Sequence, residues 1–257
     1  MNFLKHILNY RYLIFALAEK EIKIKYKSAF LGYIWSFLNP LILMIIFSVI
    51  FTYVLRIEIE KFPVFLLSAL IPWFFLSFSV SCSTTSIVDN ASLIKKVYFP
   101  HAIIPISIIA ANLVNFLISL GLLFIFLFWF KIYPTFFWLY LPLLVILQTI
   151  FLIGVCLILC ALHTVYRDIK YAVELLLVVW FYATPIFYPL SFVPDKIRGF
   201  FSLNPMSLFV NAYRDVLLYG KNLDLVILVK ISVISFIFCF FGVLIFAYYK
   251  PRFVDVT

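Results

Sequence analysis

Residues 97–130 read VYFPHAIIPISIIAANLVNFLISLGLLFIFLFWF, a run of 34 positions without Asp, Glu, Lys or Arg. A helix needs about 20 apolar residues to cross the hydrocarbon layer of a membrane, which is ~30 Å thick. The run therefore predicts a membrane-spanning helix. The whole chain agrees, because 66% of its 257 residues are apolar and only 12% are charged, about half the charged share of a soluble domain. This composition excludes the soluble globular, disordered, collagen-like and disulfide-rich classes.

Five further runs of this kind occur along the chain. The six charge-free runs cover residues 28–55, 62–88, 97–130, 132–166, 175–194 and 231–249. In lipid, a spanning backbone has to satisfy its own hydrogen bonds, and the alternating pattern of a β-barrel is absent. We therefore predict an all-α integral membrane protein with six transmembrane helices. An even number of crossings places both termini on one side.

Lysine and arginine are unevenly divided between the two sides of this predicted bundle. The side with both termini receives twelve of them, whereas the short loops of the other side receive three. Because positively charged loops are retained in the cytoplasm, we predict that both termini are cytoplasmic. The composition of these loops suits anionic lipid headgroups, and we expect no nucleic-acid partner.

Residues 195–230 do not fit a simple loop. They carry five basic residues on the predicted outer side, yet the 15 residues between Arg198 and Arg214 are mostly apolar and contain Pro205. Such a stretch is too apolar for a solvated loop and too short to cross. We predict a re-entrant pair of short helices between the fifth and sixth spans, and the alternative is a helix lying flat in the interface.

The first 27 residues have a pattern of their own. Apolar residues recur at helical spacing at Leu4, Leu8, Tyr12 and Phe15. This spacing predicts an amphipathic helix on the inner membrane surface. Residues 21–27 alternate charged and apolar, which taken alone fits a strand, but an isolated strand would leave its edges unpaired.

No internal repeat or linker divides the chain, so we predict a single membrane domain over residues 1–257. Its segments are a cytoplasmic amphipathic segment (1–27), five helices (28–194), an extracytoplasmic re-entrant segment (195–230), the sixth helix (231–249) and a cytoplasmic tail (250–257).

The residues needed for chemistry are missing. The phosphate-binding pattern G-x-x-x-x-G-K-[ST] does not occur, and the single Gly-Lys pair, Gly220–Lys221, is followed by Asn222. Any ATP hydrolysis therefore requires another chain. The three histidines lie on different segments away from acidic clusters, and no predicted span has a charge at its centre. We predict no catalytic residue, no metal site and no cofactor in this chain.

Several short motifs occur in a fixed order. They are Leu31-Gly-Tyr-Ile-Trp-Ser-Phe-Leu-Asn-Pro40, Asn90-Ala-Ser-Leu-Ile-Lys-Lys-Val-Tyr-Phe-Pro100, Tyr166-Arg-Asp-Ile169, Thr184-Pro-Ile-Phe-Tyr-Pro189 and Asn204-Pro205. Together with six spans, a basic amphipathic amino terminus and a re-entrant outer loop, they make the chain similar to the permease subunits of type 2 ABC exporters for O-antigen and related bacterial surface polysaccharides (the Wzm-like group). The resemblance covers nearly the whole chain.

This resemblance implies a homodimer of permeases in the bacterial inner membrane, joined to two copies of an ABC ATPase that bind ATP and Mg. The implied cargo is an undecaprenyl-diphosphate-linked polysaccharide. The nearest rival function is that of a type 2 ABC permease for a drug or lipid. From different classes come a membrane glycosyltransferase or acyltransferase and a passive channel or scramblase.

Two groups of charged residues are candidate functional sites on the predicted inner side. By analogy with the family, contacts with the ATPase are assigned to Asn90, Lys95, Lys96, Tyr98, Arg167 and Asp168. The alternative is an ordinary loop that obeys the positive-inside rule. Binding of the diphosphate headgroup is assigned to Arg11, Lys20, Lys23, Lys25 and Lys27. Attraction to anionic lipids explains the same cluster without a substrate.

Aromatic residues and prolines supply the remaining candidates. Aromatic rings stack on the C–H faces of sugars, and the rings assigned to a glycan channel are Tyr33, Trp35, Phe37, Trp180, Tyr182, Phe187 and Tyr188. Lipid-facing or interhelical packing is the alternative for each. An outer gate is assigned to Pro185, Pro189, Asn204 and Pro205, because prolines would end the fifth helix there.

Overall fold

The computed structural model describes residues 10–26, 35–56, 59–97 and 99–253. All regular secondary structure in these residues is helical. The elements are α2 (Arg11–Tyr26), α3 (Trp35–Val49), η2 (Ile50–Val54), α4 (Phe62–Asp89), α5 (Ala91–Lys96), α6 (Ile103–Trp129), η3 (Phe136–Tyr140), α7 (Leu141–Val165), α8 (Ile169–Tyr182), η4 (Leu190–Phe192), α9 (Asp195–Leu203), α10 (Pro205–Leu217), α11 (Leu225–Tyr249) and η5 (Lys250–Arg252).

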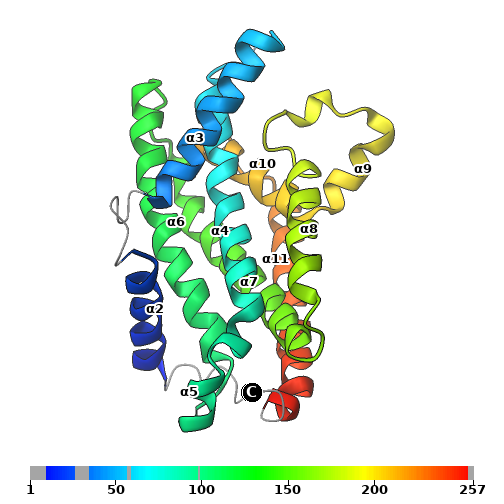
Figure 1. Cartoon of the computed structure of the whole chain (residues 1–257). Coiled ribbons are helices and arrows are strands. Elements are labelled where there is room, and N and C mark those ends of the chain that lie inside the picture. Colours follow the sequence, from blue (N-terminus) through cyan, green and yellow to red (C-terminus); the bar gives the residue numbers. More distant parts are fainter. Residues whose placement is uncertain (1–9, 27–34, 57–58, 98, 254–257) are drawn as a thin grey trace.

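Four helical segments are long and apolar enough to cross a membrane. They cover Phe62–Asp89, Ile103–Trp129, Phe136–Val165 and Leu225–Arg252. Figure 1 shows them as a bundle, with α5 at one end and α9 at the other. We call these the α5 end and the α9 end. The chain is therefore a multi-pass helical membrane protein, and α3 with η2 adds a shorter apolar helix.

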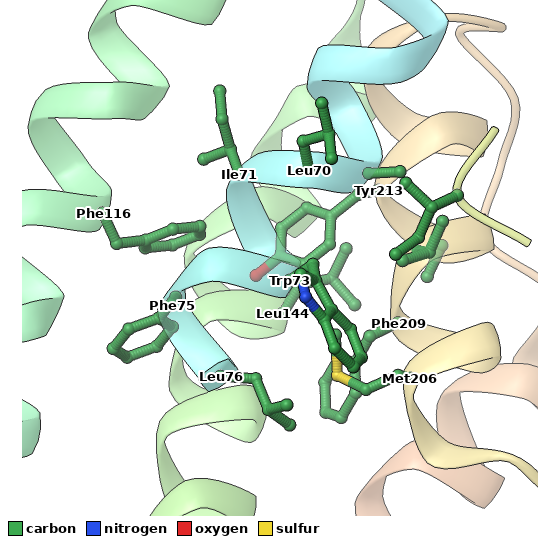
Figure 2. Close-up of a cluster of buried hydrophobic side chains, with 14 of the residues drawn as sticks. Leu70, Ile71, Trp73, Phe75, Leu76, Phe116, Leu144, Met206, Phe209 and Tyr213 are labelled. Atoms are coloured by element: carbon green, nitrogen blue, oxygen red, sulfur yellow. The ribbon is translucent and has the colours of Figure 1, made fainter. Parts of the chain in front are cut away.

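Helix α4 lies at the centre of the bundle. It contacts α6, α7, α10, α3 and α8, and its residues from Val64 to Trp73 are all buried. Figure 2 shows Tyr213 and Phe209 of α10 packed against this helix near Trp73. Because residues 64–73 are covered on every side, this part of α4 is apolar around nearly its whole circumference rather than along one stripe.

Helices α7 and α11 pack at very short range through two glycines. A Cβ added to Gly154 would lie 2.3 Å from the backbone of Phe238, and one added to Gly242 would lie 2.4 Å from the Gly154 carbonyl oxygen. Real side chains cannot be accommodated at such distances. Small residues at a membrane helix contact allow the backbones to approach and gain van der Waals contact.

The predicted spans and the helices differ most at their ends. The fifth predicted span, 175–194, corresponds to a 14-residue helix that begins at Ile169 and ends at Tyr182. The sixth helix begins at Leu225 rather than at residue 231, with Asp224 accepting a hydrogen bond from the Val226 amide (2.9 Å). The prediction from charge-free runs placed the starts of these two helices too late, because exposed charged residues such as Lys170 and Lys230 are part of the helices.

Helix α2 confirms the amino-terminal helix over residues 11–26, so the strand alternative is wrong there. Of the residues predicted to face the membrane surface, Leu4 and Leu8 lie outside the described residues, and Tyr12 and Phe15 lie on the surface of the protein. Tyr12 and Phe15 are 74% and 73% exposed, whereas Leu13 and Leu17 pack against the core beside α6. The rotation of α2 about its axis is set by its contact with α6, and Figure 1 shows the two helices side by side.

Two short helices follow α8 within residues 195–230, the segment for which a re-entrant pair was predicted. Helix α9 has no buried residue, whereas ten of the thirteen residues of α10 are buried against α4, α7 and α11. Asn204 and Pro205 separate the two helices. This boundary and the connection from α8 form the candidate site.

Candidate functional site

The chain leaves helical geometry after α8 while it is still inside the protein. Thr184, Pro185 and Ile186 are buried. Pro185 has no N–H and disfavours a helical conformation at the residue before it, which explains why α8 ends at Tyr182. Non-helical backbone that is shielded from water needs partners from elsewhere in the protein. Two side chains of the α9–α10 segment provide them.

Asn204 is the first of these side chains. Its Nδ2 donates to the Ala183 carbonyl oxygen (3.0 Å) and to Thr184 Oγ1 (3.2 Å). Its Oδ1 accepts from Trp180 Nε1 (2.8 Å) and from the Met206 amide (3.0 Å), and the second bond caps the amino terminus of α10. The structure thus brings together a predicted gate residue, Asn204, and a predicted channel aromatic, Trp180.

Arg214 is the second side chain, and the sequence reasoning missed it as a functional candidate. It is 2% exposed. Its Nη1 donates to the Pro185 carbonyl oxygen (2.6 Å), and its Nη2 donates to the carbonyl oxygens of Ile186 and, at 3.4 Å, Phe65. The guanidinium carbon lies 3.5 Å from the centroid of the Phe65 ring. An arginine that ends a mostly apolar stretch of a predicted membrane-embedded segment is the sequence signal that identifies it.

The neighbouring Tyr213 anchors α10 to α7 and α4. Its hydroxyl donates to Gln148 Oε1 (2.9 Å), and Gln148 Nε2 donates to the Pro72 carbonyl oxygen (2.9 Å). Tyr213 and Gln148 are both fully buried. This polar chain fixes α10 against both of the longer helices.

Tyr213→Phe is expected to lower the free energy of unfolding by about 1–2 kcal/mol, because Gln148 Oε1 loses its donor in a buried place. Unfolding of the purified protein by SDS in mixed micelles measures this change. Tyr219→Phe, at a half-exposed ring close to the end of α10, is the matched control and should unfold within about 0.5 kcal/mol of wild type. Equal stability of the two variants would show that the Tyr213–Gln148 hydrogen bond does not stabilise the fold.

An aromatic cluster adjoins the junction on the side of α3. Phe187 lies at its centre. Its ring stacks on that of Phe47 with centroids 5.5 Å apart and planes at 11°, and it contacts Phe51 (5.8 Å) and Phe181 (6.2 Å). Tyr182, at the edge of the cluster, is 59% exposed. Two predicted channel rings, Phe187 and Tyr182, thus lie in one cluster, with centroids 6.0 Å apart, whereas Phe47, Phe51 and Phe181 were not predicted as channel residues.

The remaining predicted gate and channel residues lie at separate places along the chain. Tyr188 donates to the Tyr182 carbonyl oxygen (3.1 Å) and contacts Phe201 of α9. Pro189 precedes η4, and Pro205 is the first residue of α10. Tyr33 lies outside the described residues, and Trp35 and Phe37 are described only as members of α3.

At the α5 end, the predicted ATPase contacts are surface residues. Lys95 and Lys96 are exposed in the last turn of α5, and Ile94 is buried beneath them. Asn90 occupies the N-cap position of α5, but its side chain makes no capping hydrogen bond. Its Nδ2 donates instead to the Ser86 carbonyl oxygen (2.9 Å), continuing the end of α4.

Two further members of this set lie in the connection between α7 and α8. Arg167 and Asp168 are both exposed there, and Figure 1 shows this connection toward the α5 end. Tyr98 lies outside the described residues.

The basic residues of α2 do not form one cluster. Lys23 pairs with Glu19, four residues earlier on the same face of α2 (2.6 Å). Lys20 pairs with Glu21 (3.7 Å) and donates to Asn90 Oδ1 (3.3 Å). A groove of about 360 Å³ separates this part of α2 from α4 and α6. Asp89 also lines the groove, so its walls carry both signs of charge.

Lys25 differs from its neighbours on α2. Its Nζ lies 4.7 Å from the centroid of the Phe78 ring of α4, and desolvation there lowers the pKa of the amine. It lines a small cleft with Asn112, Asn115 and Ser119 of α6. Arg11 contacts the Tyr12 ring at the other end of α2, and Lys27 lies outside the described residues.

These observations define a multi-pass helical membrane protein whose buried polar side chains hold a broken helix in place. Residues 12–218 match the ABC-2 type transporter family. The chain therefore belongs to the ABC-2 type transporter family.

Full-length relatives agree with this assignment. The chain is 32% identical over 257 residues, 99% of each sequence, to the O-antigen export system permease protein RfbA of Myxococcus xanthus. It is 33% identical over 256 residues, 98% of each sequence, to an O-antigen export system permease protein RfbA of Klebsiella pneumoniae. It is also 27% identical over 243 residues, 92% of each sequence, to the polysialic acid transport protein KpsM of Escherichia coli.

Proposed function

We propose that the chain is the membrane-spanning subunit of an ATP-driven exporter that moves undecaprenyl-diphosphate-linked polysaccharide across the bacterial inner membrane. The observation that carries this proposal is the end-to-end similarity to permeases named for O-antigen export, supported by the similarity to a polysialic acid transport protein. Since this chain lacks the phosphate-binding pattern, ATP and Mg are bound by a separate ATPase subunit.

The topology belongs to the same proposal. The chain crosses the membrane six times, with α3–η2 and α8 as the shorter crossings, and α9–α10 re-enters from the outer side. The α5 end and both termini face the cytoplasm. The exposed lysines of α5 and the basic residues of α2 and η5 support this orientation.

The working unit is a homodimer with two ATPase subunits. In the part of the chain that the structure describes, α4 fills the centre of a single bundle. The apolar outer faces of α3 and α8 are exposed, with Ile42, Ile46, Leu176 and Val179 among the residues on them. Together with the edge of the aromatic cluster at Tyr182, they form the surface on which a second copy completes the path.

The headgroup of the cargo binds at Lys25. The cleft beside this residue combines an amine, amide groups and aromatic rings, which are the groups that bind phosphates and sugars, and its volume of about 20 Å³ has to widen to admit them.

Lys25→Met is expected to raise the apparent KM for lipid-linked glycan about tenfold without changing kcat, because it removes a charge-assisted hydrogen bond worth about 1.5 kcal/mol. Transport by the reconstituted complex at varied glycan concentration measures both constants. Lys23→Met, which removes a neighbouring amine paired with Glu19, is the matched control with a near wild-type KM. Equal KM values for the two variants would place the headgroup elsewhere.

A cell that makes a lipid-linked polysaccharide but lacks its permease tests the central proposal. Expression of this chain with its ATPase should restore the polymer at the cell surface, and expression of either subunit alone should not. The ATPase should co-purify with the chain, and mass spectrometry should find lipid-linked glycan retained in the complex. Transport by this chain alone, or a drug as the cargo, would refute the proposal.

A further inference from the structure

Arg214 is a buried cation whose acidic neighbour, Asp215, interacts with it electrostatically without forming an ion pair. Among the residues that the structure describes, its guanidinium lies within ion-pair distance of no carboxylate, and its Nε has no hydrogen-bond acceptor. The other nitrogens donate to backbone carbonyl oxygens. A buried charge is costly, so its presence in a membrane protein indicates a specific task.

The carbonyl groups held by Arg214 directly precede the central ring of the aromatic cluster. Pro185 and Ile186 accept its two shortest hydrogen bonds, and Phe187 is the next residue. The planar guanidinium has two terminal nitrogens and can bond two successive carbonyls at once. The position of the Phe187 backbone is therefore tied to α10, while its ring is stacked on Phe47 of α3.

Helix α10 is in turn fixed to the bundle through the residue before Arg214. Tyr213 bonds to Gln148 of α7. A movement of α10 relative to α3 would consequently carry the 183–187 connection with it and separate the two stacked rings. The polar contacts thus connect the α9–α10 pair with an aromatic contact on another helix.

We propose that Arg214 is a positioning residue for a ring closure: it holds the backbone before Phe187 so that this ring stays stacked on Phe47, and the two rings have to separate before a glycan passes. This inference rests on the proposed function, because it assigns the closed state of the same path. Phe187 and Phe47 form the barrier, and Arg214 acts through Phe187.

The test is the release of a small entrapped sugar, maltotriose, from liposomes that contain the complete permease–ATPase complex without ATP. Wild type should retain the sugar. Phe187→Ala, Phe47→Ala and Arg214→Gln should each release it several-fold faster. Arg214→Lys should lie between wild type and Arg214→Gln, because one ammonium group cannot hold both carbonyls in the same geometry.

The double variant Phe187→Ala with Arg214→Gln separates positioning from general damage. If Arg214 acts through Phe187, the double variant should release sugar no faster than Phe187→Ala. Faster release by the double variant would overturn the positioning role. Phe200→Ala, at a ring of α9 that is 75% exposed, is the control and should behave as wild type.

If an arginine variant does not fold, the two ring variants still test the closure. Phe187→Ala and Phe47→Ala leave the buried polar groups intact, and retention of maltotriose by both variants would overturn the closure. The export assay tests the proposed function, which a wild-type complex that exports no glycan would refute. The maltotriose assay tests the closure and contains no glycan cargo. The two failures are thus distinguishable.

Discussion

Gly154→Leu is expected to prevent the stable association of α7 with α11 and to leave little folded protein after extraction into detergent. Even the first carbon of a new side chain would lie 2.3 Å from the backbone of Phe238, and a backbone cannot rotate away as a side chain can. The helices would have to separate along their whole contact. The cost should exceed the about 1–3 kcal/mol that is typical of overpacking.

Alanine variants of Gly154 and Gly242 test the same contact between α7 and α11. Gly154→Ala and Gly242→Ala should each lower the SDS concentration at which the protein unfolds, and the double variant should lower it by less than the sum, because one displacement of α11 relieves both overlaps. Gly121→Ala on α6 meets no atom within 4 Å and should unfold as wild type. Stability of Gly154→Ala equal to that of Gly121→Ala would contradict the close contact.

The helical class and the central spans could be predicted from the sequence because the criterion is a length of chain without charge. Hydrocarbon imposes this criterion directly on each crossing. The same criterion fails at helix ends, where exposed charges are tolerated. Lys170 and Glu174 belong to α8, and Lys230 belongs to α11. The end of α8 was set instead by Pro185, whose effect is local.

Some residues of the junction were predicted as candidates from the sequence, but their contacts were not. Asn204 and Trp180 stand out because of their types, yet a hydrogen bond between residues 24 positions apart depends on how α8 and α10 cross. Arg214 was counted only as a loop charge. The separate partners of Lys20, Lys23 and Lys25 depend on how α2 is rotated against α6, which the apolar pattern of α2 does not determine.

Lys95→Glu combined with Lys96→Glu is expected to reduce polysaccharide export about tenfold or more while the protein still folds. Both side chains are exposed, whereas Ile94 holds α5 against the core. The substitutions should therefore cost the fold little stability. Each new glutamate interacts unfavourably with the carboxyl end of the short helix, which costs about 0.3–1 kcal/mol.

The contact with the ATPase is expected to lose more binding free energy than the fold loses stability. In the proposed complex, these lysines face acidic or polar groups of the ATPase, and reversal of both charges replaces attraction by repulsion. A loss of more than about 1.4 kcal/mol in this contact corresponds to the tenfold effect. Surface polysaccharide and recovery of the ATPase with the purified chain are the two measurements, and both should fall together.

The matched control has the same charge change at the α9 end. Lys196→Glu with Lys221→Glu alters two exposed lysines and should leave ATPase recovery at the wild-type level, since the proposed outer side does not meet the ATPase. Wild-type export by a stably expressed Lys95→Glu, Lys96→Glu variant would exclude α5 as the coupling contact. Loss of export with full ATPase recovery would show instead that α5 transmits the movement of the ATPase without contributing to its affinity.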